Sequence, residues 1–310
     1  MKFRNIKYII RHPKGMLLKL FFQIGWIFPD KLYLKLVYYI TNKEWINIDN
    51  PKTFNEKLQW LKLNDHRPEY TIMVDKYAVK DYVAKIIGKE FVIPTIGVWD
   101  KPENIDWGLL PRQFVLKTTH GGGNIGVVIC KDKATFDRKR AVIKLKKALS
   151  DDIYKRLREW PYKHVRKRII AEEYISNGMN DLVDYKFFCF NGQPKYCQVI
   201  TGRNTKKCID FFDHDWTHQP FNGFGHFPFA DVEPVKPKNY ELMWDLAKQL
   251  AGNKPFSRID LYDADDKVYF GEITFYPTSG LDKIEPKEWE GVFDSSLLIP
   301  DTTEQNSNLQ

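Results

Sequence analysis

Cysteine is scarce in this sequence, and its arrangement argues against two kinds of small domain. The 310 residues contain four cysteines: Cys130, Cys189, Cys197 and Cys208. No two of them have the short spacing of a zinc knuckle. A chain of this length can also bury enough apolar surface to fold without disulfide bonds. We therefore expect reduced thiols and a cytoplasmic protein.

A long hydrophobic run is also missing near the N-terminus. The uncharged run LFFQIGWIFP covers only ten residues, 20–29, between Lys19 and Asp30. A helix that spans a bilayer needs about 20 apolar residues, and no small-residue cleavage site follows this run. We expect a chain that is neither processed as a secreted protein nor inserted across a membrane.

Acidic residues are absent before Asp30. Six basic residues precede it: Lys2, Arg4, Lys7, Arg11, Lys14 and Lys19. The net charge is +8, and outside these six residues 42 basic residues face 40 acidic ones. The positive excess is therefore an N-terminal feature and not a stripe on the folded body, so we expect no nucleic-acid partner.

Two interpretations of this N-terminus remain open. Residues 1–30 combine the basic residues with Phe21, Phe22, Trp26 and Phe28, a composition that favours peripheral contact with an anionic membrane. Such contact would hold a cytoplasmic protein at the inner face of the membrane. Alternatively, these helices pack on the rest of the protein and the aromatic side chains belong to its core.

The order of predicted elements indicates an α+β protein. Hydrophobic residues make up 43% of the chain and aromatic residues 15%, enough for a sizeable core. We expect helices broken at Pro13 and Pro29, and further helices at 53–64, 75–87, 138–149 and 239–251. The expected strands are 92–98, 114–116, 168–174, 185–190, 194–201, 207–212, 256–262 and 267–275. The predicted organisation is a basic helical region at 1–74, a domain at 75–300 with lobes of about 75–178 and 179–300, and a disordered tail at 301–310.

The segment FVLKTTHGGGNIGVVIC, residues 114–130, carries the first candidate site. An apolar strand delivers Lys117 to a loop that contains Gly121, Gly122, Gly123 and Gly126. Glycines allow backbone N–H groups to approach a phosphate, and a lysine adds positive charge for it. The alternative is a flexible hairpin loop without a ligand.

Residues 257–280 carry the second candidate site. Strand alternation places Arg258 and Asp260 on one face, and Glu272 and Thr274 on the same face of the next strand. A short hairpin brings the two carboxylates together, which favours a Mg²⁺ ion. An arginine beside them suits a transferring phosphoryl group. The alternative is a surface hairpin with solvated acids, which we expect for the turn at 263–266.

A third element is the strand that ends in Glu172, Glu173, Tyr174 and Ile175, followed by a strand that begins near Asp184. It fits a hinge between two lobes that binds adenine through backbone groups, with Asp184 reaching the ribose. Solvated acids at a strand end are the alternative.

Taken in order, these segments resemble ATP-grasp enzymes such as D-alanine–D-alanine ligase. The sequence resembles most closely the TupA-like branch, which is linked to teichuronopeptide synthesis. The segments that carry this resemblance are FNEKLQWLKLND, DKYAVKDYV, LKTTHGGG, DYKFFCFNG and FGEITFYPTSG. The resemblance covers roughly residues 50–290. It implies an ATP-grasp fold in which two α+β lobes grip ATP after a helical N-terminal region.

The resemblance also implies a role for each residue. Lys76 and Lys117 would contact the nucleotide phosphates, the loop from Gly121 to Gly126 would cover them, and the stretch from Glu172 to Ile175 would hold adenine. Lys186 and Arg203 would face phosphate or substrate, and Arg258 would steady the transferred phosphoryl group. Asp260, Glu272 and Thr274 would bind Mg²⁺, although most ATP-grasp enzymes have asparagine where this chain has Thr274.

The implied activity is an ATP-dependent carboxylate–amine ligase with an acyl-phosphate intermediate and ADP and phosphate as products. Its expected partners are ATP and an acidic sugar or amino-acid substrate in cell-surface polysaccharide synthesis. A glycosyltransferase is the alternative, because Asp263-Ala-Asp265 and Asp213-His-Asp215 match an Asp-x-Asp metal motif in their letters. No βαβ unit opens the chain to support it. A non-catalytic module that binds anionic surfaces through the basic N-terminus is a second alternative.

Overall fold

The computed structural model describes residues 13–299 except 124, 177–181, 203–204 and 224–226. The basic residues before Pro13, the tail at 301–310 and Arg203 lie outside the described residues, so the predictions made for them stay predictions. The helices are α2 (Pro13–Ile24), α3 (Asp30–Asn42), α4 (Phe54–Asn64), α5 (Glu69–Val74), α6 (Ala78–Ile87), α7 (Arg138–Leu149), α8 (Ile153–Leu157) and α9 (Tyr240–Ala251). Short 3-10 helices include η1 (Gly25–Ile27), η2 (Lys89–Phe91), η3 (Pro102–Asn104), η4 (Trp160–His164), η5 (Pro277–Gly280) and η6 (Lys287–Phe293).

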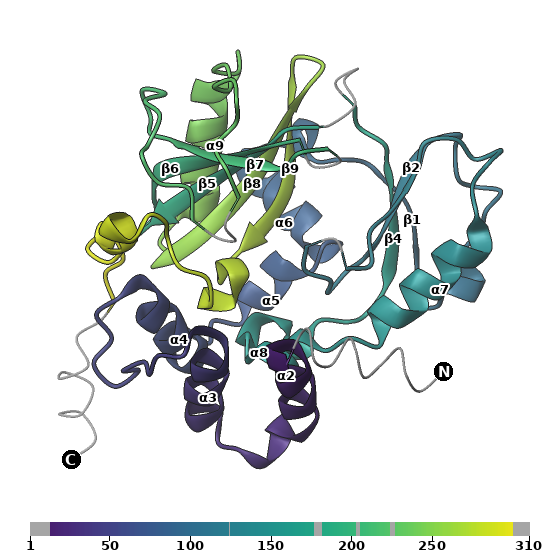
Figure 1. The fold of residues 1–310 in the computed structure, drawn as a ribbon. Coiled ribbons are helices and arrows are strands. Elements are labelled where there is room, and N and C mark those ends of the chain that lie inside the picture. The colour runs from purple at the N-terminus through teal and green to yellow at the C-terminus, as the bar shows by residue number, and fades with distance from the viewer. Residues whose placement is uncertain (1–12, 124, 177–181, 203–204, 224–226, 300–310) are drawn as a thin grey trace.

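Two antiparallel sheets organise the described residues (Figure 1). The four-stranded sheet has the order β1-β4-β2-β3, and the five-stranded sheet has the order β7-β6-β5-β8-β9. The first sheet consists of β1 (Thr95–Trp99), β2 (Phe114–Thr118), β3 (Val128–Cys130) and β4 (Ile169–Glu173). The second consists of β5 (Asp184–Phe190), β6 (Gln193–Thr201), β7 (Cys208–Phe212), β8 (Phe256–Ala264) and β9 (Lys267–Thr274). The mixture of helices and antiparallel sheets confirms the α+β prediction.

Local signals set several element ends as predicted. The helix α4 begins with a capping box, in which Thr53 Oγ1 accepts from the Glu56 N–H at 3.3 Å and Glu56 Oε2 accepts from the Thr53 N–H at 3.0 Å. Pro13 is the first residue of α2, and Pro29 is the N-cap of α3. Because proline lacks an N–H donor, it is tolerated at such helix starts.

Two predicted element starts are wrong by three residues. The helix α6 begins at Ala78 and not at Asp75, because the Asp75 side chain accepts hydrogen bonds from the N–H groups of Tyr77 and Ala78 and so caps the helix from outside. The strand β1 begins at Thr95 and not at Val92, which forms only an isolated bridge to Phe270. Pro94 intervenes and has no N–H to give to a ladder.

The hydrophobic cores do not follow the order of the chain. Around the five-stranded sheet, one core includes residues of α3, α4, α5, α6, α9 and η6. A second, smaller core joins the four-stranded sheet to α7 through Phe114, Ala171 and Leu145. Figure 1 shows α7 against the four-stranded sheet, and α9 against the five-stranded sheet. Each sheet therefore has a hydrophobic core of its own.

Within the described residues, no helix has both the length and the apolarity that crossing a bilayer requires.

Candidate active site

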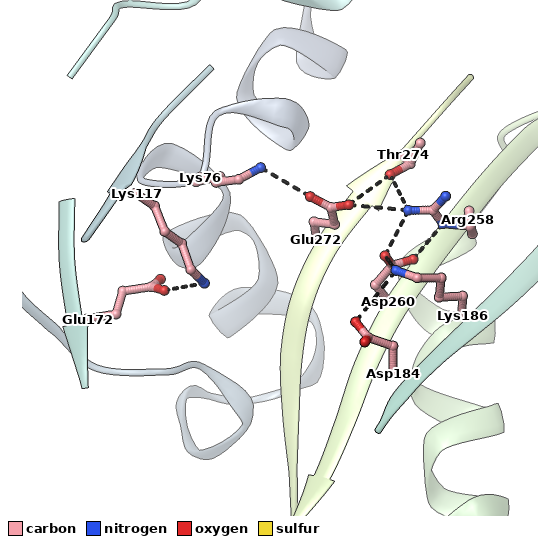
Figure 2. A network of polar contacts seen from close by, with 9 residues as sticks. All are labelled: Lys76, Lys117, Glu172, Asp184, Lys186, Arg258, Asp260, Glu272 and Thr274. Atoms are coloured by element: carbon pink, nitrogen blue, oxygen red, sulfur yellow. Dashed lines mark hydrogen bonds and ion pairs between the residues drawn. The ribbon is translucent and has the colours of Figure 1, made fainter. Parts of the chain in front are cut away.

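Asp260 and Glu272 lie side by side on one face of the five-stranded sheet, as the alternation predicted. They are direct partners in the β8–β9 ladder, and Arg258 and Thr274 form the next pair on the same face of the sheet. Arg258 Nε donates to Asp260 Oδ1 at 2.7 Å, and its Nη2 donates to Asp260 Oδ2 at 2.8 Å and to Glu272 Oε1 at 3.2 Å. The arginine thus bridges both carboxylates (Figure 2).

The strand β5 adds Lys186 and Asp184 to the same face. Lys186 is the ladder partner of Asp260, and its Nζ forms a buried ion pair with that carboxylate. The Asp184 carboxylate lies 3.7 Å from the same Nζ and is 2% exposed. Asp184 therefore belongs to the charged group around Asp260, while its predicted contact with ribose stays a prediction.

Lys76 connects this group to the turn before α6. It lies in the turn before α6, where its backbone N–H donates to the Thr119 carbonyl at 3.0 Å. Its Nζ donates to Glu272 Oε2 at 3.1 Å (Figure 2). Burial would raise the pKa of Glu272, but the charges of Lys76, Lys186 and Arg258 outweigh it and hold this pKa well below its usual range.

Lys117 lies at the end of β2 and forms an ion pair with Glu172 of β4, with 2.6 Å between Nζ and Oε2. Lys80 of α6 reaches the other oxygen of Glu172 at 2.5 Å. Burial raises the pKa of Glu172, and the two lysines more than offset it, so the net shift is downward. Sequence reasoning missed Lys80. Its position four residues after Lys76, in the first turn of α6, was the available signal.

The glycine loop closes between β2 and β3. The Thr118 N–H donates to the Gly126 carbonyl at 3.2 Å. Gly126 has φ +75°, and a Cβ there would lie 2.3 Å from Thr118 Oγ1, so the turn itself requires glycine. Gly123 also has positive φ but has open space around it. The loop is thus tightly packed at Gly126 and has free space at Gly123. Such a loop suits a role in covering nucleotide phosphates.

The predicted hinge follows β4. Strand pairing ends at Glu173, whose N–H donates to the Pro94 carbonyl at 3.2 Å. Tyr174 and Ile175 come directly after the paired region. Backbone groups for an adenine ring would therefore come from Tyr174 and Ile175, because Glu172 and Glu173 already pair within the sheet.

The residues fit a magnesium ion held jointly with nucleotide phosphates. Among the described residues no three His, Cys, Asp or Glu side chains gather as a closed metal site. Two carboxylates and the hydroxyl of Thr274 converge instead, with Thr274 Oγ1 3.5 Å from Glu272 Oε1. Mg²⁺ is typically held by one or two carboxylates together with substrate phosphates and water. This oxygen set matches that pattern, and Arg258 and Lys186 neutralise it in the structure.

A buried lysine holds the loop that follows these carboxylates, and sequence reasoning missed it. Lys62 of α4 is 2% exposed, and its Nζ donates to the Ser279 carbonyl and hydroxyl, each at 2.8 Å. Gln59 Nε2 donates to the carbonyls of Ser279 and Gly280 at 2.9 Å. Thr278 and Ser279 have φ of 48° and 60°, so the loop keeps a backbone conformation that side chains rarely adopt.

The two Asp-x-Asp matches lie elsewhere. Asp265 is exposed and lies in the β8–β9 turn, and Asp215 is exposed in the turn after β7. Every strand pair within the two sheets is antiparallel. Neither motif therefore lies in a parallel nucleotide-binding half.

Comparisons with known proteins agree with the expected fold. A family model described as TupA-like ATPgrasp matches residues 56–297. No curated protein matches the chain.

Among solved structures, the chain is similar to the D-alanine–D-alanine ligase from Bacillus anthracis, with 15% identity, 77% of this chain and 70% of that chain covered, and a TM-score of 0.43. For the D-alanine–D-alanine ligase from Coxiella burnetii the identity is 14%, 82% of this chain and 67% of that chain are covered, and the TM-score is 0.42. For the D-alanine–D-alanine ligase from Helicobacter pylori the identity is 13%, 77% of this chain and 60% of that chain are covered, and the TM-score is 0.38, so the chain spans less than two thirds of that protein.

Proposed function

The chain belongs to the TupA-like ATP-grasp family, and we propose that it is an ATP-dependent ligase that joins a carboxylate to an amine. ATP-grasp ligases use ATP and Mg²⁺. The substrate carboxylate attacks the γ-phosphate of ATP, and an acyl phosphate and ADP form. The amine then displaces phosphate and loses a proton. Positioning and charge neutralisation supply most of the catalysis in such a reaction.

One observation carries the proposal. Asp260 and Glu272 lie on one sheet face with Arg258 between them, and Lys76 reaches Glu272 from the turn before α6. Two adjacent carboxylates attract a divalent cation, and flanking cations stabilise the charge of a transferring phosphoryl group. Bound ATP and Mg²⁺ would replace the ion pairs that now neutralise these side chains.

The proposed residue roles are those that the family resemblance implies. Lys76 and Lys117 bind the phosphates, and the loop with Gly121, Gly122, Gly123 and Gly126 covers them. The stretch from Glu172 to Ile175 holds adenine, through the backbone groups of Tyr174 and Ile175, and Asp184 contacts the ribose. Asp260, Glu272 and Thr274 hold the magnesium ion.

Three basic residues act on the reacting groups. Arg258 steadies the transferred phosphoryl group, while Lys186 and Arg203 receive the substrate carboxylate through charge-assisted hydrogen bonds. The burial of Lys186 beside Asp260 supports its part of this proposal.

The cellular setting of the proposed reaction is cell-surface polysaccharide synthesis at the inner face of the membrane. The acidic substrate is a uronic acid or an amino acid, and the amine is that of an amino acid. Four free, buried cysteines support a cytoplasmic protein. Trp26 and Ile27, which follow the basic N-terminal residues in the sequence and are 80% and 60% exposed, support contact with an anionic membrane.

The test is the identity of the products. Incubation with ATP, Mg²⁺, a uronic acid and an amino acid should give ADP and phosphate only when both acid and amine are present. Hydroxylamine in place of the amine should trap the acyl phosphate as a hydroxamate. Release of UDP from a sugar nucleotide, which the glycosyltransferase alternative requires, or of AMP and pyrophosphate from ATP, would contradict the proposal.

A further inference from the structure

The charged side chains of the site form a straight row across the five-stranded sheet. Glu272 pairs with Asp260, Asp260 with Lys186, and Lys186 with Gln198 of β6. Direct partners on antiparallel strands place their side chains on the same face. The amide of Gln198 therefore belongs to the face that carries the candidate magnesium ligands.

Gln198 differs from the other members of this row. Asp260, Lys186 and Glu272 are ion-paired, as Figure 2 shows. Gln198 is 3% exposed, yet its side-chain amide makes no hydrogen bond to any described residue. The amide atoms of Gln198 are not among the fully buried polar atoms that lack a partner, so the amide stays accessible on the face of the site and is available to a ligand.

The place of Gln198 in the row limits what that ligand is. Neighbouring strands lie about 4.8 Å apart, so Gln198 is one strand beyond Lys186 and about two strands, or about 10 Å, beyond Asp260. On the far side its partner is Phe211, which is fully buried. Gln198 is therefore the last polar side chain of the row. A ligand group that Gln198 binds lies next to the substrate group that Lys186 receives.

We propose that Gln198 is a specificity-determining residue that recognises a neutral polar group, a hydroxyl or an amide, on the carboxylate substrate. This inference rests on the proposed function, in which Lys186 receives the carboxyl group. A primary amide offers both a donor and an acceptor, so a hydroxyl or another amide can pair with both, whereas a purely apolar chain can pair with neither. The substrate is thus an acid with such a group about one strand spacing from its carboxyl.

The two sources of this chemistry are a hydroxylated sugar acid and an N-acylated amino acid. D-glucuronate and N-acetylglycine represent them, and hexanoate lacks the group. Each acid is given to the full-length protein with ATP, Mg²⁺ and hydroxylamine, so that the amine is the same in every reaction. Hydroxamate and ADP are measured for the wild-type protein and for Gln198→Leu, which keeps a similar volume.

The wild-type protein should use at least one of the two polar acids with a KM well below that for hexanoate. Gln198→Leu should raise the KM for that acid about tenfold or more and leave kcat, the KM for ATP and the KM for hexanoate nearly unchanged. Gln193→Leu, on the exposed start of the same strand, is the matched control and should change none of these values. If the leucine variant does not fold, the shorter amide of Gln198→Asn should raise the same KM.

The outcomes separate this inference from the proposed function. If no acid gives hydroxamate with the wild-type protein, the ligase proposal fails and this inference fails with it. If hydroxamate forms but the polar acids are not preferred, or if Gln198→Leu keeps the preference, the ligase proposal stands and Gln198 is not its specificity determinant. The polar acid that responds to the variant identifies the source.

Discussion

Lys117 is the single residue whose removal should most directly weaken nucleotide binding. A charged hydrogen bond to phosphate contributes about 1.5–3 kcal/mol, which is roughly ten- to a hundredfold in affinity. We expect Lys117→Ala to lose that much ATP affinity in calorimetric titration. The variant should stay folded because Lys80 still neutralises Glu172 at 2.5 Å. Lys131→Ala, at an exposed position after β3, is the control, and equal ATP affinity in both variants would exclude Lys117 from the site.

The carboxylate pair should be essential for metal-dependent turnover. Asp260→Asn and Glu272→Gln each remove a charged oxygen ligand while keeping the side-chain shape, so ADP formation should drop to near background at any Mg²⁺ concentration. Thr274→Asn should remain active, because an amide oxygen is also a magnesium ligand. Circular dichroism should show folded proteins. Asp265→Asn in the exposed turn should retain full activity, and comparable turnover in Asp260→Asn would rule out the magnesium role.

Acid should destabilise the protein through Glu172, whose pKa is lowered in the folded state although burial acts in the opposite direction. The usual pKa of glutamate is 4.5, so the stabilisation by its ion pairs is complete above about pH 4.5. It is lost as the pH falls below that value towards the folded-state pKa. Thermal melts at pH 6 and at pH 4 should show a smaller drop for Glu172→Gln than for the wild-type protein. An identical drop would mean that other carboxylates carry the acid sensitivity.

At the scale of elements, α4 holds the loop after β9 through Lys62. Burial lowers the pKa of Lys62 to about 8, although the Glu159 carboxylate opposes the shift. The unfolded chain keeps the usual pKa of 10.5, so between about pH 8 and 10.5 it binds more protons than the folded protein. The contribution of Lys62 to stability therefore rises with pH across that window, by on the order of 3 kcal/mol.

The variant Lys62→Met tests this pH dependence. Denaturant unfolding at pH 7.5 and pH 10 should show wild-type stability rising relative to the variant. Turnover should also fall, because Ser279 and its loop lose two hydrogen bonds beside the carboxylate pair. Lys52→Met, at an exposed position before α4, should follow the wild type in both measurements. A parallel pH dependence for wild type and Lys62→Met would refute the role of this lysine.

At the scale of the whole molecule, the proposed contact with an anionic membrane involves the first described elements, α2, η1 and α3. Phe21 stacks on Phe28 and Tyr33 at ring distances of 5.3 and 5.1 Å, so part of the aromatic set packs internally. Trp26 is 80% exposed. Deleting residues 1–30 would also remove the Asp30–Arg158 ion pair. Point substitutions therefore give a sharper test than truncation.

Co-sedimentation with vesicles that contain phosphatidylserine at low salt supplies the measurement. Trp26→Ala, combined with glutamine at the four basic positions before Pro13, should reduce binding, because each basic residue near such a surface contributes about 1 kcal/mol. Added salt should reduce wild-type binding by screening. Trp45→Ala, at a residue 62% exposed after α3, is the control. Equal sedimentation of all three proteins would exclude the membrane contact.

Much of the fold could be predicted because its signals are local. The capping box at Thr53, the basic helix at 138–149 and the β8–β9 hairpin each depend on residues close in sequence. The pairing of Asp260 with Glu272 belongs to this group, since strand alternation and a short turn bring the two side chains together. The two wrong boundaries, at Asp75 and Val92, lie where a side-chain cap and a proline changed the local geometry.

The sequence by itself thus determined the α+β class, the family resemblance and the hairpin with its two carboxylates. Only the tertiary structure decided which distant residues meet: Lys80 and Lys117 on Glu172, Lys62 on Ser279, and α6 in the core of the five-stranded sheet. These contacts join segments far apart in the chain, and no local periodicity or spacing encodes them. They form because a charged or apolar group that folding removes from water is stable only when it contacts a suitable partner. The packing of the two sheets and their helices determines which partners are close enough.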